Sequence, residues 1–307
     1  MTTPSITPAW QKRDRGLTAR MIVSFAILTL LYLIFISVLA YAGVGFVPIT
    51  IIASLMILAQ WYFSDKIVLW SSGAKIVTRE QYPELHDIVE RIVARTNLPK
   101  PKIAVINATI PNAFATGKSP KSSVVCVSKG LLNLLETEEL EGVLAHELTH
   151  IRNRDVLVLT LASLFSTVAW YLMQFSLYGG MGYGYGGGGG RSRGNGAGAM
   201  AIIIVVALLT WLVSFLIIRA ISRYREFAAD RGGAQMTGKP AKLASALMKI
   251  SGNMKKIPTK DLRQVEGLNA FFIIPALSGS SISNLFSTHP PVEKRIEKLM
   301  QMEMSMG

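Results

Sequence analysis

Four long runs of this chain carry no charged residue, and each approaches the length of a membrane-spanning helix. A helix crosses the hydrocarbon core of a bilayer with about 20 mainly apolar residues. The pattern therefore predicts about four transmembrane helices, at residues 21–43, 46–64, 156–178 and 200–218. The second run also fits a buried hairpin helix, because it starts near Pro48 and contains Gln60. The first run has the small-x-small form of a signal cleavage site at residues 40–42, but its length favours a retained anchor.

Between the second and third runs, the apolar positions take the spacings of short soluble elements. Residues 82–97 carry apolar side chains at helical spacing, and Pro83 suits the start of a helix. Residues 102–108 and 122–128 are rich in Val and Ile and predict two strands. With the segment 111–117 between them, they predict a small sheet with one open edge, and such an edge can hold an extended peptide. Thr137 is then predicted to cap the next helix.

The composition agrees with this pattern, because half of the 307 residues are hydrophobic and only 17% are charged. This apolar content excludes a disordered chain, and a single cysteine, Cys126, excludes a disulfide scaffold. The net charge of +13 invites comparison with nucleic-acid binders. In a chain this apolar, the charge instead indicates a membrane protein with one positive side, so the lipid bilayer is expected as a partner and nucleic acid is not.

The distribution of charge predicts the orientation in the membrane. Residues 1–20, 65–155 and 219–307 carry net charges of +3, +1 and +7, and they hold 30 of the 32 Lys and Arg residues. With four spans these segments share one side, which the positive-inside rule makes the cytoplasm. Both termini are then cytoplasmic. Residues 179–198 contain 12 of the 26 glycines and predict a flexible loop on the outer side.

The fold class that follows is a mainly α integral membrane protein with a cytoplasmic domain in two halves. The predicted segments are a cytoplasmic tail (1–20), two transmembrane helices (21–64), a first cytoplasmic half (65–155), a third transmembrane helix (156–178), the Gly-rich external loop (179–199), a fourth transmembrane helix (200–222) and a second cytoplasmic half (223–307).

Residues 146–150 read His-Glu-Leu-Thr-His, on a helix predicted from its apolar spacing. Two histidines four residues apart lie about 40° apart around a helix axis, one turn along, so both imidazoles reach one ion. A glutamate beside the first histidine reaches a water on that ion. This H-E-x-x-H arrangement is typical of zinc peptidases, and it assigns His146 and His150 to the metal and Glu147 to the general base. A chance pentapeptide is improbable because the chain has only four histidines.

A catalytic zinc needs a third protein ligand, and the segment after the fourth run offers one. Glu226 and Asp230 are four residues apart in a helix-favouring segment. Glu226 is the candidate ligand, and Asp230 is placed to hold the free nitrogen of a ligand histidine. Spacing alone leaves open that Glu226 forms a surface ion pair with Arg223 or Arg225. If both spans continue as helices, His150 and Glu226 lie about 9 Å and 12 Å beyond the membrane-spanning runs. Because these distances are similar, they favour a metal-ligand role for Glu226 over a surface ion pair.

The sequence resembles the HtpX-like membrane-bound zinc peptidases, which are related to the CAAX prenyl-protein endopeptidases. The resemblance covers most of the chain. It is carried by Pro-Asn-Ala-Phe-Ala-Thr-Gly at 111–117, Ala-His-Glu-Leu-Thr-His-Ile-Arg-Asn-Arg-Asp at 145–155, Arg-Glu-Phe-Ala-Ala-Asp at 225–230 and Ser-Thr-His-Pro-Pro at 287–291, in that order. The glycine loop looks longer than the family usually has.

The resemblance implies one Zn²⁺ per subunit, held by His146, His150 and Glu226, with Glu147 as base. It also implies that Asn112 and His289 contact substrate or steady the oxyanion; the residues alone favour a helix-entry role for His289. The implied fold is a zincin-like metalloprotease domain on the cytoplasmic face of the cell membrane. The implied function is quality control, in which misfolded or damaged membrane proteins are hydrolysed. The alternative of a signal-processing protease with a defined cleavage site remains open. A scaffold or transporter with a structural metal is disfavoured, because a structural site needs four protein ligands and no fourth Cys or His presents itself nearby.

Overall fold

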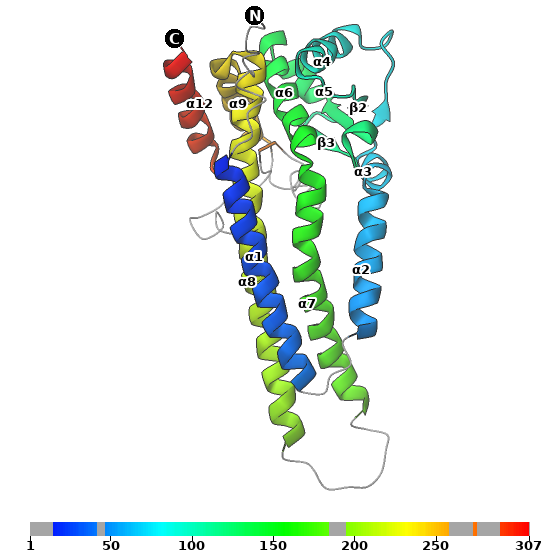
Figure 1. The fold of residues 1–307 in the computed structure, drawn as a ribbon. Helices are drawn as coiled ribbons and strands as arrows, with labels where there is room; N and C mark the ends of the chain where they lie inside the picture. Colours follow the sequence, from blue (N-terminus) through cyan, green and yellow to red (C-terminus); the bar gives the residue numbers. More distant parts are fainter. Residues whose placement is uncertain (1–14, 42–46, 184–194, 258–272, 275–288, 307) are drawn as a thin grey trace, which may run out of the picture. The chain divides into compact units, whose positions relative to one another are not determined.

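The computed structural model describes residues 15–41, 47–183, 195–257, 273–274 and 289–306 (Figure 1). Two compact units make up the chain. One unit consists of Met1–Thr18, Tyr62–Leu157 and Ser222–Gly307, and the other of Ala19–Trp61 and Val158–Ile221. The second unit contains most of the predicted membrane runs, and the first contains every candidate site residue.

The apolar unit is built from long helices. They are α1 (Arg15–Tyr41), α2 (Val47–Tyr62), most of α7 (Asp155–Tyr183) and the first part of α8 (Asn195–Thr237). Leu28 of α1, Ala162 of α7 and Ile221 of α8 form a buried cluster. Many other apolar side chains point outward, such as Ile22, of which 65% is exposed. Exposed apolar side chains on long helices are the pattern expected of a lipid-facing surface.

Among the described residues, two stretches are long and apolar enough to span a membrane, Gly16–Val38 and Ile204–Thr237. They correspond to the first and fourth predicted runs. The second run meets the same criterion only when α2 is joined across a bend to the next helix, α3 (Ser64–Ser72). The apolar part of α7, Asp155–Val168, is shorter. Two spans are thus supported by length and composition, and the four-span arrangement stays a prediction.

The Gly-rich loop predicted at residues 179–199 extends further than the structure allows, because helices occupy both of its ends. Helix α7 continues to Tyr183 and α8 begins at Asn195, so the prediction of loop at 179–183 and 195–199 is wrong. Once a helix is nucleated, each added residue gains one backbone hydrogen bond, and this can outweigh the low helix propensity of a few glycines. The remaining residues, 184–194, lie outside the described part of the chain.

The other unit contains a four-stranded sheet in the order β1-β2-β4-β3. Strand β2 (Lys102–Ile106) runs parallel to β4 (Val124–Ser128), which confirms the two predicted strands with slightly shorter bounds. Strand β3 (Ala113–Thr116) pairs antiparallel with β4 and forms one edge, while β1 (Lys75–Ile76) forms the other. Sequence analysis did not assign β1 or β3 as strands, because runs of two and four residues are too short for an alternating pattern.

The two faces of the sheet are covered differently. One face, with Ile103, Val105, Val125 and Val127, packs against the main core. That core includes residues of α4 (Pro83–Thr96), α5 (Lys129–Leu134), α6 (Thr137–Asn153), α9 (Pro240–Met254) and α12 (Val292–Met306). The other face packs against Val68 of α3. Cys126 on this face is fully buried, as predicted, and burial together with the charge of Glu147 raises the pKa of its thiol to about 12, so it is protonated at neutral pH.

The helix that carries the H-E-x-x-H sequence begins one residue earlier than predicted. Its N-cap is Glu136, and the Thr137 hydroxyl donates to Glu84 at 2.6 Å instead of capping the helix. The Glu139 carboxylate accepts from the Glu136 backbone N–H at 3.0 Å, which satisfies one of the free donors at this end. Glu139 also accepts from Ser245 at 2.6 Å and pairs with Lys249 at 2.8 Å. These contacts to α9 hold the first turn of α6 in place. They therefore fix the position of the H-E-x-x-H residues, which lie further along the same helix.

Candidate metal centre

Three donor side chains from two helices converge in the interior of the unit that contains the four-stranded sheet. His146 and His150 lie on the same side of α6, and their Nε2 atoms are 3.1 Å apart. Glu226 comes from α8, with its carboxylate oxygens 3.7 Å from Nε2 of His146 and 3.5 Å from Nε2 of His150. One donor atom from each residue lies within 4.8 Å of the others. The structure thus brings together the three residues that spacing predicted.

The second nitrogen of each histidine faces a carboxylate. Nδ1 of His146 lies 3.0 Å from Asp230, and Nδ1 of His150 lies 2.5 Å from Asp155. A carboxylate only accepts hydrogen bonds, so in the neutral form of each ring the proton lies on Nδ1 and the lone pair lies on Nε2. Two lone pairs and a carboxylate then face one another at close range. This set of acceptors repels itself unless a cation lies between them, and imidazole with carboxylate is a donor set that suits a divalent metal.

Each of these two carboxylates is itself paired with a buried arginine. Arg295 of α12 donates to both oxygens of Asp230, at 2.7 Å and 2.8 Å, and Arg225 of α8 pairs with Asp155. Both arginine side chains are almost fully buried. Burial alone would raise the pKa of Asp230, but Arg295 outweighs it and holds that pKa below its usual value. Burial lowers the pKa of Arg225 to about 10, which still leaves it charged at neutral pH.

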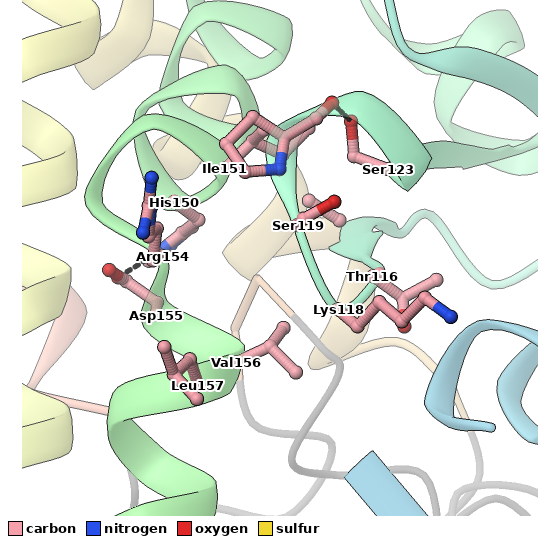
Figure 2. Close-up of a pocket in the computed structure, with 13 residues that line it drawn as sticks. Thr116, Lys118, Ser119, Ser123, His150, Ile151, Arg154, Asp155, Val156 and Leu157 are labelled. Atoms are coloured by element: carbon pink, nitrogen blue, oxygen red, sulfur yellow. Dashed lines mark hydrogen bonds and ion pairs between the residues drawn. The ribbon is translucent and has the colours of Figure 1, made fainter. Parts of the chain in front are cut away.

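The local backbone explains how Asp155 reaches the helix that precedes it. Helix α6 ends at Asn153, and Arg154 adopts a left-handed conformation with φ of 54°. The chain therefore turns before α7 begins, and the first residue of α7 points its carboxylate back at His150 (Figure 2). The Arg225 guanidinium donates to the Asn153 carbonyl at 2.7 Å, which holds the same turn from α8.

Two glycines allow α8 to approach α6 closely enough for this arrangement. A Cβ atom at Gly233 would lie 2.8 Å from the backbone nitrogen of His146, and one at Gly232 would lie 2.5 Å from the Thr149 side chain. Any larger residue at Gly233 would push the two helices apart, because the obstacle is backbone. The pair at 232–233 begins two residues after Asp230, so this close contact fixes where along α8 Glu226 and Asp230 face the histidines.

The two buried glutamates of the site have pKa shifts in opposite directions, because their charged neighbours differ. Glu147 is buried, and this burial raises the pKa of its carboxyl, although the neighbouring His146 and His150 act in the opposite direction. A raised pKa brings a carboxylate closer to the value that suits a general base at neutral pH. Burial also acts on Glu226, but there His289 and Arg295 outweigh it and hold the pKa well below its usual range. Glu226 therefore stays ionised, as a metal-binding carboxylate must be.

His289 and Asn112, the two residues predicted only from the resemblance, differ in how they contact the centre. Nδ1 of His289 is 3.1 Å from the Glu226 carboxylate, so the structure brings His289 to the centre. Asn112 precedes β3, where its amide oxygen accepts from the Ile273 backbone N–H at 3.0 Å. The Ile273 carbonyl in turn accepts from Arg295 at 2.7 Å. Asn112 is thus joined to the centre through Ile273 and Arg295.

A small cavity lies between the edge strand and the candidate metal centre. Its volume is about 20 Å³, which is room for a water molecule or two. It is lined by residues 115–120 and 123, by His150 and Ile151, and by the turn into α7 at residues 154–157 (Figure 2). Helix α6 packs against β3. The edge strand that can hold an extended peptide therefore lies beside the helix that carries His150.

Comparison with known proteins assigns the chain to a family. The model of peptidase family M48 matches residues 79–303, which include every residue of the centre. The chain belongs to peptidase family M48. This M48 peptidase is 51% identical over 299 residues to Protease HtpX homolog 2 of Methanosarcina mazei, an alignment that covers 97% of this chain and 99% of that protein. It is 53% identical over 293 residues to Protease HtpX homolog of Moorella thermoacetica, with 95% and 96% covered. The predicted resemblance to HtpX-like proteins is confirmed.

A solved structure supports the same fold. The crystal structure of S. mikatae Ste24p matches this M48 peptidase with a TM-score of 0.57 and 18% sequence identity. The match covers 91% of this chain but only 64% of Ste24p. The family, the HtpX relatives and the apolar helices together support a membrane protease, and the His-His-Glu group could hold its metal ion.

Three residues that surround the centre of this M48 peptidase, Asp155, Arg225 and Arg295, are not predicted from the sequence. Arg225 was considered as a surface partner of Glu226, but the structure buries it against Asp155. Asp155 had a usable signal, because it follows His150 by five residues and could return to it across a turn. Arg295 had none, since it is 65 residues from Asp230 and lies in a helix rich in charged residues.

Proposed function

We propose that this chain is a zinc-dependent endopeptidase that hydrolyses misfolded or damaged membrane proteins. The observation that carries the proposal is the pair of histidine lone pairs and the Glu226 carboxylate, which face one another in a buried site. Two imidazoles and one carboxylate match the protein ligands of catalytic zinc, which leave a position open for water or substrate. Of the described residues, only His146, His150 and Glu226 form a group that could hold a metal, whereas a structural site needs four ligands.

In this mechanism His146, His150 and Glu226 hold the zinc, while Asp230 and Asp155 fix the tautomers of the two histidines. Bound zinc supplies Lewis acidity, which lowers the pKa of a water molecule towards about 7 and polarises a carbonyl group. Glu147 accepts the proton of the attacking water and then passes it to the nitrogen of the leaving amine, so that the peptide C–N bond breaks. His289 and Asn112 are the proposed donors to the oxyanion, and such a donor is typically worth about 3–4 kcal/mol.

The substrate is proposed to bind as an extended strand beside β3, because β3 is an edge strand in the described part of the chain and packs against α6. Backbone hydrogen bonds do not depend on side-chain identity, so an enzyme that binds its substrate through them acts on any unfolded segment. This favours a quality-control protease over a protease that recognises one sequence. The location proposed is the cytoplasmic membrane, with the centre and both termini in the cytoplasm. The distribution of the Lys and Arg residues supports this orientation.

The test of the proposed function compares two forms of one membrane substrate, one stable and one destabilised by a point mutation. Both forms are reconstituted in vesicles with the protease, and the initial rates of cleavage are measured. Proteolysis of an opened segment follows the population of the open form, so each 1.4 kcal/mol of destabilisation should raise the rate about tenfold. Equal rates for the two forms would contradict quality control. A single recurrent site across unrelated substrates would indicate a signal-processing protease instead.

We expect that Asp155→Asn weakens the binding of zinc about 10- to 100-fold, the usual cost of losing a partner of a ligand histidine. The amide keeps the shape of the side chain but removes the charge that faces Nδ1 of His150 and the Arg225 guanidinium. Zinc affinity is measured by competition with a chromophoric chelator in detergent micelles. Asp87→Asn is the control, because the Asp87 side chain is 45% exposed and pairs with Arg79 at the surface. Unchanged affinity in Asp155→Asn would show that Asp155 does not position His150.

A further inference from the structure

The short helix α3 has two different sides. Val68 packs against Ala104, Phe114 and Cys126 of the sheet, with Leu69 beside it. On the other side, Phe63, Ile67 and Trp70 follow one another at the spacing of a helix face, with 45%, 47% and 86% of each residue exposed. Trp70 is thus one of the most exposed large hydrophobic residues of the described chain. A row of solvent-exposed apolar side chains on one side of a short helix indicates a surface that binds a partner.

Lysines border this apolar face. Lys66 is exposed on α3 itself and lies 5.9 Å from the ring of Phe63, and Lys75 is exposed on the adjoining strand β1. Lys118 lies 3.4 Å above the ring of Tyr62. Ile76, next to Lys75, is 53% exposed and extends the apolar surface onto β1. The face therefore combines exposed aromatic and aliphatic side chains with positive charge.

The place of this face in the chain points to its partner. Helix α3 starts at Ser64, directly after the apolar helix α2, which ends at Tyr62. The rings of Tyr62 and Phe63 stack edge to face, with centroids 5.0 Å apart. Aromatic residues at the end of an apolar helix mark the boundary between hydrocarbon and headgroups. A one-sided apolar helix with lysines on its border lies in that boundary, and its charge favours anionic lipids.

We propose that α3, together with Tyr62, Phe63 and the β1 residues Lys75 and Ile76, is a membrane-interface anchor. We name this surface the α3 anchor. Its partner is the headgroup region of an anionic phospholipid bilayer, into which Trp70 inserts. Because Val68 packs on the sheet beside Phe114 of the edge strand β3, the anchor holds that strand at a fixed depth relative to the lipid surface. The proposal does not depend on the catalytic chemistry, so its failure would leave the proposed function untouched.

Fluorescence of Trp70 tests the α3 anchor in the full-length chain. Trp10, Trp61, Trp170 and Trp211 are replaced by Phe, and the protein is reconstituted in vesicles of phosphatidylcholine with phosphatidylglycerol. Quenching is measured with iodide in the water and with lipids brominated near the headgroup end of the acyl chain. We expect strong quenching by the brominated lipid and severalfold weaker quenching by iodide than for the control. The control is Met248→Trp in the same background with Trp70→Phe, because Met248 is 51% exposed on α9.

The other possible partners give different results. Quenching by iodide equal to that of the control, without quenching by brominated lipid, would overturn the proposal. Shielding that depends on the ratio of protein to lipid would show that a second copy of the chain covers the face. Shielding that appears only when a peptide is added would show a peptide site. Omission of phosphatidylglycerol should reduce quenching by brominated lipid, and Lys66→Gln with Lys75→Gln should abolish this dependence, whereas Lys255→Gln should preserve it.

Discussion

Replacement of Glu147 by Gln should remove peptide-bond hydrolysis while the chain keeps its zinc. The amide has no basic oxygen to accept the proton of the attacking water, and it has no acidic proton to pass to the leaving amine. General acid–base catalysis contributes about 10²–10⁴-fold to a rate, so the residual activity should fall to that extent or below detection. The measurement combines cleavage of a reconstituted membrane substrate with elemental analysis for zinc, and we expect one equivalent in both proteins.

The zinc should remain because Glu147 is not among the three converging donors. Stability should also be preserved. Burial raises the pKa of Glu147, which means that the folded protein disfavours the charged carboxylate. A neutral amide of the same shape avoids that cost, so the thermal midpoint of Glu147→Gln should equal or exceed that of the wild type. Loss of activity is then separated from unfolding.

Glu138→Gln is the matched control on the same helix. Its side chain is 45% exposed and pairs with Lys239 and Lys242, and a surface ion pair of this kind contributes little. We expect wild-type hydrolysis in this variant. Hydrolysis at the wild-type rate in Glu147→Gln would show that Glu147 is not the base. Loss of zinc in Glu147→Gln would instead place the residue among the metal ligands.

Local periodicity explains which parts of the fold could be predicted from the sequence. The helix over residues 82–97 and the two Val-rich strands follow from spacings that repeat within a few residues, and the structure has all three. The pair His146 and His150 follows from the same arithmetic of one helical turn. By contrast, β3 is defined by its pairing with β4 and not by its own four residues. The cap at Glu136 depends on Glu139 three residues later, so the preference for Thr at such positions misplaced it.

The surroundings of the candidate metal centre depend on contacts between distant segments, which a single sequence does not reveal. Arg225 is adjacent to Glu226 in the chain, yet its partner is Asp155 on another helix. Charged residues in a helix are typical of a solvated face, and Arg295 shares α12 with the exposed residues Glu293 and Lys294. Only the packing of α12 against the rest of its unit turns Arg295 inward. The ligands were therefore accessible to motif analysis, whereas the groups that orient and neutralise them were not.

Replacement of Arg295 by Met should cause a large loss of stability. Arg295 is 1% exposed, pairs with both oxygens of Asp230 and lies 3.4 Å from the Glu226 carboxylate. Met fills a similar volume but leaves these buried carboxylates without their cation. Removing one partner of a buried ion pair costs about 3–5 kcal/mol, and we expect a loss of that size. The measurement is the thermal midpoint in detergent micelles, and Lys294→Met on the exposed side of α12 is the control, with a change near zero.

Two further measurements identify the uncompensated charge as the cause. In the wild type Arg295 is the main group that holds the pKa of Asp230 below its usual value, so in Arg295→Met, where only His146 still opposes burial, that pKa should rise. A group whose pKa is raised in the folded state contributes stability as it becomes protonated, so the deficit of Arg295→Met should shrink as the pH falls. The added substitution Asp230→Asn removes the buried charge but keeps an acceptor for Nδ1 of His146. It should therefore recover part of the loss, and a deficit that neither acid nor Asp230→Asn reduces would mean that Arg295 stabilises the protein by packing alone.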